Sequence, residues 1–316
     1  MSNYKWYGRA ALLALLAALI GLTVSSCARK TGQNITERNV TDREGIEVTI
    51  KGPLNRVVST APSNTEIIVD LGLAKKLVAI DVYSTNIEGL PDGLIQLDFM
   101  NPDAEVLVGL EPDIIIANGH NATGTGEDPF RVLREMGIPV VYIPMGQNIE
   151  DIYLDIAFVA DLFGIQQQGE ALIHSTREEV EKIRAATAAV EPKRSVYFEI
   201  SEAPFMFTLG KGSFLHDMIT VIGAINIFEN DGTYVSPSAE AIIDRNPDVI
   251  LTNVNYIDNP IGELKSRPGF EHINAVMNNR VYLIDMDSSS RPSARITLAL
   301  RQMSRAVYPE VYDDKE

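Results

Sequence analysis

Strand-like and helix-like segments alternate along most of the chain, and this alternation limits the folds open to it. Short apolar or alternating runs typical of β-strands occur at residues 47–50, 56–60, 77–80, 114–117 and 140–143. Helix-like segments, with apolar positions three and four residues apart, lie between them. Such chains form parallel sheets with helices on their faces and right-handed crossovers. We therefore expect an α/β fold.

A long helical stretch divides the chain into two such units. Apolar residues recur at spacings of three and four through residues 148–189, with Gly164 and Gly169 as the expected breaks. We interpret residues 46–147 as an N-terminal lobe, 148–189 as a rigid connecting helix and 190–316 as a C-terminal lobe. The alternative interpretation is a helix pair that belongs to one lobe.

An internal repeat supports two lobes built from related units. Residues 102–118 (PDAEVLVGLEPDIIIAN) align without a gap with residues 237–253 (PSAEAIIDRNPDVILTN), and seven of the seventeen positions are identical. Each copy predicts a helix, then an Asn-Pro-Asp or Glu-Pro-Asp turn, then a buried strand. Chance convergence on a common α/β turn is the alternative explanation.

The N-terminus has the features of a lipoprotein signal. Lys5 and Arg9 precede an apolar run at residues 10–24, which is shorter than the roughly 20 residues of a membrane-spanning helix. Small residues then lead to Cys27, the sole cysteine. This arrangement resembles a lipobox and predicts a signal peptide at 1–26 and a lipid anchor on Cys27, holding the protein on the extracytoplasmic face of a membrane. An ordinary secretory signal with an incidental cysteine is the alternative.

The polar segment at residues 27–45 shows no periodicity and predicts a tether.

The formal net charge is −16, which disfavours nucleic acid and anionic lipid surfaces as partners. The four histidines are scattered, so we expect no metal site made by protein ligands alone and no resident cofactor. No Gly-x-Ser-x-Gly motif occurs, and Gly210-Lys211-Gly212-Ser213 is not a complete P-loop, so we do not expect an enzyme.

Several segments together carry a resemblance to the class III substrate-binding proteins of ABC importers, a group that includes binding proteins for ferric siderophores, haem and vitamin B12. These segments are residues 56–73, the two repeat copies, 133–141, 196–228 and 280–296. The resemblance implies two Rossmann-like lobes with parallel sheets, joined by one long backbone helix, and a ligand cleft between the lobes. A continuous helix resists bending, so cleft closure is expected to be small.

The function that the resemblance implies is capture of an iron complex, such as a ferric siderophore, or of a corrinoid. The ligand would then pass to a membrane permease and, through it, to an ATPase subunit. A haem-binding member of the same family and a ligand sensor without a transporter are the alternatives. In the haem-binding case, His120 or Tyr83 would supply an axial ligand.

Candidate ligand-binding residues lie in loops that follow strands, where the carboxyl ends of parallel strands form crevices. A mixture of aromatic, apolar and polar loop residues suits a large planar or chelated ligand. Arg291 is favoured for ligand carboxylates or catecholates, and Arg295 is an alternative with a structural role. The candidates are Tyr83, Phe99, Met100, Asn118, His120, Phe205, Lys211, Asn255, Tyr256 and Arg291.

Two glutamates are candidates for contact with the permease. Glu66 lies three residues after Ser63, and Glu240 two residues after Ser238. The resemblance implies that these carboxylates project from the outer rim of each lobe and pair with permease arginines. Helix capping is compatible with this role, since Ser63 and Glu66 have the spacing of a capping box and acidic residues are favoured in a first turn.

Overall fold

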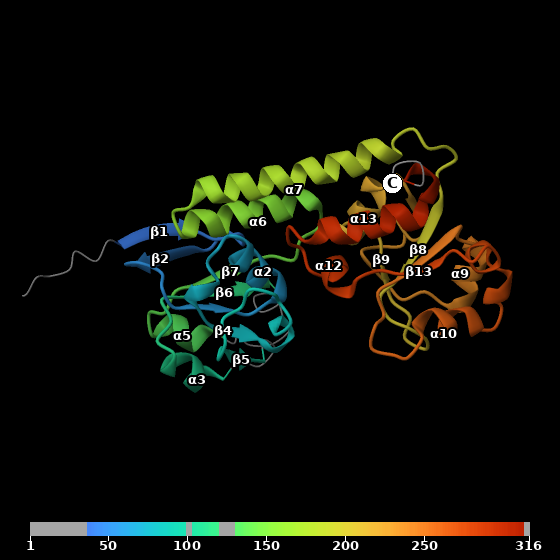
Figure 1. The fold of residues 1–316 in the computed structure, drawn as a ribbon. Helices are drawn as coiled ribbons and strands as arrows, with labels where there is room; N and C mark the ends of the chain where they lie inside the picture. Colours follow the sequence, from blue (N-terminus) through green and yellow to red (C-terminus); the bar gives the residue numbers. More distant parts are fainter. Residues whose placement is uncertain (1–36, 99–102, 120–129, 313–316) are drawn as a thin grey trace, which may run out of the picture. The chain divides into compact units, whose positions relative to one another are not determined.

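In the computed structural model, the described residues are 37–98, 103–119 and 130–312 (Figure 1). The proposed signal peptide, Cys27 and the candidates Phe99, Met100 and His120 lie outside these ranges. The predicted α/β class is confirmed, because parallel sheets and helices alternate along the chain. None of the helices in the described ranges is long and apolar enough to cross a membrane.

The N-terminal lobe is built on a parallel sheet of five strands among the described residues. The strand order is β5(Ile95–Leu97), β4(Leu77–Asp81), β3(Val57–Ser59), β6(Ile114–Asn118) and β7(Val140–Ile143). Strands β3 and β6 are almost wholly buried, as expected for the centre of a sheet covered on both faces. The helices of this lobe are α2(Pro62–Asp70), α3(Ala104–Gly109) and α5(Arg131–Glu135), with 3₁₀ turns η1(Ala74–Lys76) and η2(Val82–Ser84).

The C-terminal lobe has a second parallel sheet, of four strands within the described ranges. Their order is β10(Ile225–Asn226), β8(Ser195–Glu199), β12(Val249–Thr252) and β13(Val281–Leu283). Strands β9(Thr208–Leu209) and β11(Tyr234–Val235) form a separate antiparallel ribbon. The helices are α8(Phe214–Val221), α9(Ala239–Arg245), α10(Pro260–Ser266), α11(Asn274–Met277), α12(Met286–Ser290) and α13(Ile296–Val307), with η3(Phe270–His272) and η4(Pro309–Val311).

The repeat found in the sequence is also a structural repeat. Each copy is a helix followed by a central strand, α3 then β6 and α9 then β12. The carboxylate of Asp113 accepts hydrogen bonds from the backbone N–H groups of Asn55 and Arg56, just before β3. Asp248 does the same for Ser195 at the start of β8, with a distance of 3.0 Å. The Pro-Asp turn therefore joins equivalent strand pairs in both lobes.

The connector is a helical hairpin that ends in one long helix, and the expected break at Gly164 is confirmed. Helices α6(Ile149–Leu162) and α7(Gln166–Thr187) pack side by side (Figure 1). Gly164, with φ +67°, forms the turn between them, because residues with a side chain rarely adopt this conformation. Gly169 lies inside α7, where an added β-carbon would be 2.5 Å from the β-carbon of Ala160. Gly169 thus permits close helix packing instead of breaking the helix.

One hydrophobic cluster runs through both lobes and the hairpin. It includes Ile67 and Ile116 in the N-terminal lobe, Ile156 on α6, and Ile219 and Leu251 in the C-terminal lobe. Separation of the lobes would expose this apolar surface to water, which costs about 25 cal/mol per Å². The expectation of limited cleft closure therefore rests on this shared core together with the helical connector.

The predicted tether at 27–45 is wrong in its last part, where the structure has regular strands. β1(Glu37–Thr41) pairs with β2(Glu47–Lys51), and the turn between them is tied to the N-terminal lobe. Asp42, which is 5% exposed, accepts hydrogen bonds from the backbone N–H groups of Glu44, Ile46 and Tyr142. A polar sequence can form this hairpin because its buried carboxylate is satisfied by backbone donors.

Candidate ligand-binding cleft

A cavity of about 1050 Å³ lies at the carboxyl ends of the parallel strands. Its walls come from loops after β3, β4, β6 and β7 in the N-terminal lobe and after β12 and β13 in the C-terminal lobe. The β9–β11 ribbon and the start of α8 complete it. The volume is at the upper end of the range for small-molecule pockets, about 300–1,000 Å³. The cavity is therefore large enough for a bulky ligand.

Aromatic and apolar side chains are accessible in this cavity. Tyr83 is 64% exposed and Tyr234 is 62% exposed, and Met145 and Phe214 also line the cavity. Tyr234 stacks on Phe207, with ring centroids 6.4 Å apart and an interplanar angle of 17°. This contact orients the Tyr234 ring. The two tyrosines, one from each lobe, are suited to contact a flat or rounded apolar ligand surface.

The turn that carries Tyr83 is fixed by a buried carboxylate. Asp81, at the end of β4, is fully buried and accepts a hydrogen bond of 2.9 Å from the Tyr83 backbone N–H. The hydroxyl of Ser84 donates to its other oxygen. Burial raises the pKa of Asp81, and these two hydrogen bonds oppose the rise. The Tyr83 side chain is thus presented from a rigid turn.

Arg291 lines the cavity, but its guanidinium is engaged within the protein. It donates a hydrogen bond of 3.0 Å to Glu66 Oε1. It also donates to the Tyr83 carbonyl and to Asn86 Oδ1, each at 3.0 Å, and pairs with Asp287 at 2.7 Å. The Arg291 side chain is only 11% exposed. The Arg291 guanidinium therefore already has two carboxylates and two neutral oxygens of the protein as partners.

The prediction that Glu66 projects from an outer rim is wrong. Glu66 is 1% exposed, and its second oxygen accepts a hydrogen bond of 2.5 Å from the buried hydroxyl of Ser293. Burial raises its pKa, whereas the hydrogen bonds from Ser293 and Arg291 lower it. The capping box is absent too, because α2 begins at Pro62 without a side-chain cap. The Glu66 carboxylate binds residues of the other lobe instead.

Two further contacts join the same parts of the lobes. Arg295 pairs with Asp70 at 2.7 Å, so this arginine has the structural role that the sequence left open. Asn86 donates a hydrogen bond of 2.6 Å to Asp287. Together with the pair between Arg291 and Glu66, these contacts form a polar bridge at one side of the cavity. We call these six residues the interlobe bridge.

The structure brings four of the predicted ligand-binding residues to the cavity and leaves three outside its lining. Tyr83, Asn118, Asn255 and Arg291 line it.

Phe205 is 82% exposed at the tip of a loop closed by the bridge between Ser201 and Phe207, and it is not among the lining residues. Lys211 and Tyr256 do not line the cavity either. The Tyr256 hydroxyl instead donates a hydrogen bond to Glu202. The cavity lining therefore lacks these three predicted residues in the described part of the chain. Glu240 is exposed in the first turn of α9, where Ser238 is the N-cap.

Sequence reasoning missed several lining residues, among them Tyr234, Phe214, Gln147 and Glu44. Tyr234 follows Gly232, a turn signal that places it in a hairpin. Glu44 had no such local signal. Its turn reaches the cavity because Asp42 binds the backbone of Tyr142, a contact between residues 100 positions apart.

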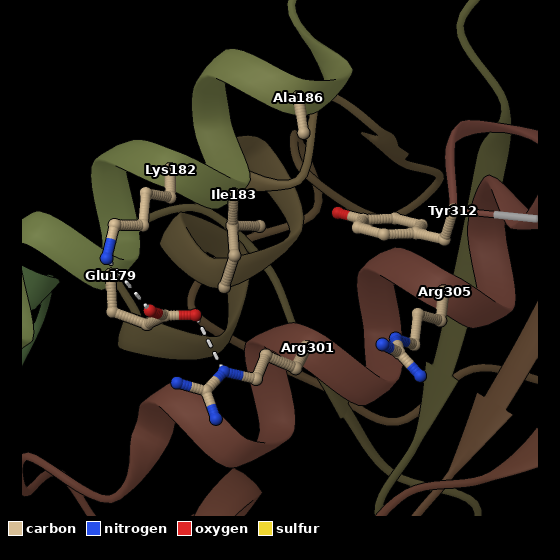
Figure 2. Close-up of a pocket in the computed structure, with 7 residues that line it drawn as sticks. All are labelled: Glu179, Lys182, Ile183, Ala186, Arg301, Arg305 and Tyr312. Carbon is tan, nitrogen blue, oxygen red and sulfur yellow. Dashed lines mark hydrogen bonds and ion pairs between the residues drawn. The ribbon is translucent and has the colours of Figure 1, made fainter. Parts of the chain in front are cut away.

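A second, smaller hollow of about 330 Å³ lies between α7 and α13 (Figure 2). Glu179 pairs with two of its basic side chains, at 2.6 Å from Arg301 and 3.8 Å from Lys182. The hydrogen bond from Arg301 lowers the pKa of Glu179. We assign this hollow a structural role, because the ion pair between Glu179 and Arg301 joins α7 to α13. In the ranges described above, no group of three or more His, Cys, Asp or Glu side chains is arranged to hold a metal ion.

Comparison with known proteins identifies the group to which this architecture belongs. The sequence profile of the family described as periplasmic binding protein matches residues 57–287. The chain belongs to the periplasmic binding protein family. Its solved neighbours are class III members with two lobes, so the predicted two-lobed class is confirmed.

The chain is similar to binding proteins from several bacteria. The chain is 28% identical over 280 residues to an uncharacterized ABC transporter substrate-binding lipoprotein of Bacillus subtilis, covering 87% of each chain. It is 27% identical to a vitamin B12-binding protein of Vibrio cholerae, covering 79% of this chain and 88% of the relative. A possible iron-binding protein from Staphylococcus epidermidis has a similar structure, with TM-score 0.72, 32% identity, and 81% and 99% coverage. The chain is thus a substrate-binding protein of an ABC transporter.

Proposed function

We propose that this protein captures a large metal-bearing ligand, either an iron complex or a corrinoid, and delivers it to an ABC permease. The observation that carries the proposal is the cavity of about 1050 Å³ at the strand ends, lined by accessible aromatic and uncharged polar side chains. The names of the relatives, which include iron-binding and vitamin B12-binding proteins, support the same ligand class.

The cavity lining matches a ligand with both apolar surface and many hydrogen-bonding groups. Tyr83 and Tyr234 offer ring faces from opposite lobes. Asn118, Gln147 and Asn255 add amide groups that can both donate and accept hydrogen bonds. If the ligand is haem, Tyr83 and Tyr234 are the described lining residues that carry a phenol oxygen for the iron.

We further propose that Glu105 and Glu240 contact the permease. The sequence repeat aligns these two residues, and each lies exposed in the first turn of its helix, α3 or α9. Asp103 and Ser238 cap the two helices. A helix that leads into a parallel strand begins near the carboxyl edge of the sheet, so both glutamates belong to the cleft-side rim. Glu105 thereby replaces the buried Glu66 in this role.

Attachment to the membrane is the remaining part of the proposal. We infer that Cys27 is acylated after removal of residues 1–26, since an apolar run and small residues precede it. The lipoprotein relative from Bacillus subtilis supports this inference. Replacement of Cys27 with Ala should abolish lipid attachment, measured by mass spectrometry of the N-terminal peptide. Retained acylation in this variant would show that another residue is modified.

A thermal-shift panel tests the ligand class directly. The detergent-solubilised full chain would be heated with cyanocobalamin, ferrioxamine B, ferric enterobactin or haem. A ligand that binds only the folded state adds about 2.7 kcal/mol at a concentration of 100 times its Kd. For a chain of this size we therefore expect Tm to rise by about 5 °C with at least one compound. No shift with any of the four would contradict the proposed ligand class.

A further inference from the structure

The charge of the cleft points to a narrower ligand class, an inference that rests on the proposed function. In the described part of the chain, the lining side chains with a formal charge are Glu44, Asp287 and Arg291. Arg291 is held by two carboxylates, Asp287 in the lining and Glu66 behind it. The positive charge is therefore already balanced, and Glu44 leaves the cleft with an excess of negative charge.

Glu44 lies in a turn that several hydrogen bonds hold in place. Its own backbone N–H donates a hydrogen bond of 3.0 Å to Asp42, the carboxylate that also binds the Tyr142 backbone. The neighbouring Arg43 donates to the Tyr142 carbonyl and, through its guanidinium, to Asp155 at 2.7 Å. Four hydrogen bonds thus hold the turn: one within the turn itself, two to Tyr142 on β7 and one to Asp155 on α6. These contacts fix the position of the Glu44 backbone relative to the N-terminal lobe.

Gly119 opens the space that the Glu44 side chain occupies. A β-carbon added to Gly119 would lie 2.8 Å from Glu44 Oε1 and 3.0 Å from the α-carbon of Pro144. The carboxylate therefore packs over a bare stretch of backbone after β6. Both Gly119 and Pro144 line the cavity, so the carboxylate lies at the cavity wall.

We propose that this cleft selects neutral or positively charged ligands over anionic ones, and that Glu44 is the residue that sets the preference. An anionic ligand must displace Glu66 or Asp287 from Arg291 and also approach the Glu44 carboxylate. A neutral ligand rich in amide groups can form hydrogen bonds with the polar lining without breaking an ion pair. A cationic ligand gains from Glu44. The favoured classes are amide-bearing corrinoids and neutral or cationic ferric hydroxamates.

Two matched ligand pairs test the proposal by isothermal titration of the full chain. The first pair is cyanocobalamin and its monocarboxylic acid derivative. The second is ferrioxamine B, which has a free ammonium group, and its N-succinyl derivative, which has a carboxylate. We expect the neutral or cationic member to bind roughly five- to tenfold more tightly within each pair that binds. Equal or tighter binding of the anionic member would overturn the proposal and leave the proposed function standing.

Variants show whether Glu44 is responsible. Glu44→Gln should bring the affinity ratio of a pair close to one, chiefly by improving binding of the anionic member and weakening that of ferrioxamine B. Glu47→Gln, an exposed carboxylate on the same hairpin outside the cavity lining, is the matched control and should leave the ratio unchanged. If Glu44→Gln leaves the affinity ratio of a pair unchanged, another residue sets the selectivity and the role of Glu44 is refuted. Failure of both pairs, haem and ferric enterobactin to bind would refute the proposed ligand class as well.

Discussion

Loss of the Arg291 guanidinium should destabilise the protein strongly, because it leaves the Glu66 carboxylate buried without its cation. Glu66 is 1% exposed and retains only the Ser293 hydroxyl as a close side-chain donor once Arg291 is removed. Breaking a buried ion pair from one side typically costs about 3–5 kcal/mol. We therefore expect Arg291→Met to lower Tm by roughly 6–10 °C at neutral pH, at about 2 °C per kcal/mol for a chain of this size.

A double-mutant cycle separates the stranded charge from lost packing. Glu66→Gln in the Arg291→Met background removes the unpaired carboxylate and should restore much of the lost stability, so the two effects will not add. Arg291→Met alone should also become less destabilising as the solution is acidified, because protonation neutralises a buried carboxyl whose pKa burial raises. Urea unfolding followed by far-UV circular dichroism provides the free energies. A loss below about 1 kcal/mol, or strictly additive effects, would refute this account of the bridge.

Three other consequences are open to measurement. Burial raises the pKa of Asp155 to about 6. The protonated carboxyl therefore favours the folded state by up to about 3 kcal/mol below pH 4, and this stabilisation is lost as the pH rises through 6. Asp155→Asn should flatten that part of the stability profile, and an unchanged profile would contradict the assignment. Gly169→Val should destabilise by about 1–3 kcal/mol in thermal melts through its clash with Ala160, and full stability would show that the helices tolerate separation. Alanine at Glu105 and Glu240 should leave ligand affinity unchanged and reduce uptake in cells, with the double variant worst, whereas lost affinity would place these residues in the cleft.

The sequence predicted the sheets better than their connections. Buried runs such as residues 114–117 define central strands by composition alone, and the Pro-Asp turns of the repeat fix how neighbouring strands begin. In the connector, the break expected at Gly164 was right and the one expected at Gly169 was wrong, because the two glycines look alike in a sequence. One forms a turn at positive φ, whereas the other accommodates the β-carbon of Ala160. Only the packed helices distinguish these roles.

The site was predicted where position after a strand was sufficient. Tyr83, Asn118 and Asn255 reached the cavity for that reason. Glu66 was misplaced because its partners, Arg291 and Ser293, are more than 200 positions away in the chain. A glutamate three residues after a serine fits both a capping box and a tertiary ion pair. The repeat contained the better signal, since it aligns Glu240 with Glu105 and not with Glu66.

The measurement that tests the central claim most directly is native mass spectrometry of the full chain with an equimolar mixture of the corrinoids and iron complexes named above. We expect one metal-bearing ligand per chain, recovered unaltered. The double variant Tyr83→Ala/Tyr234→Ala should lose the adduct, since it removes a ring from each wall of the cavity. The control Tyr256→Ala, an exposed tyrosine outside the lining, should retain it. No adduct with any compound, or an adduct unaffected by the double variant, would contradict capture in this cleft.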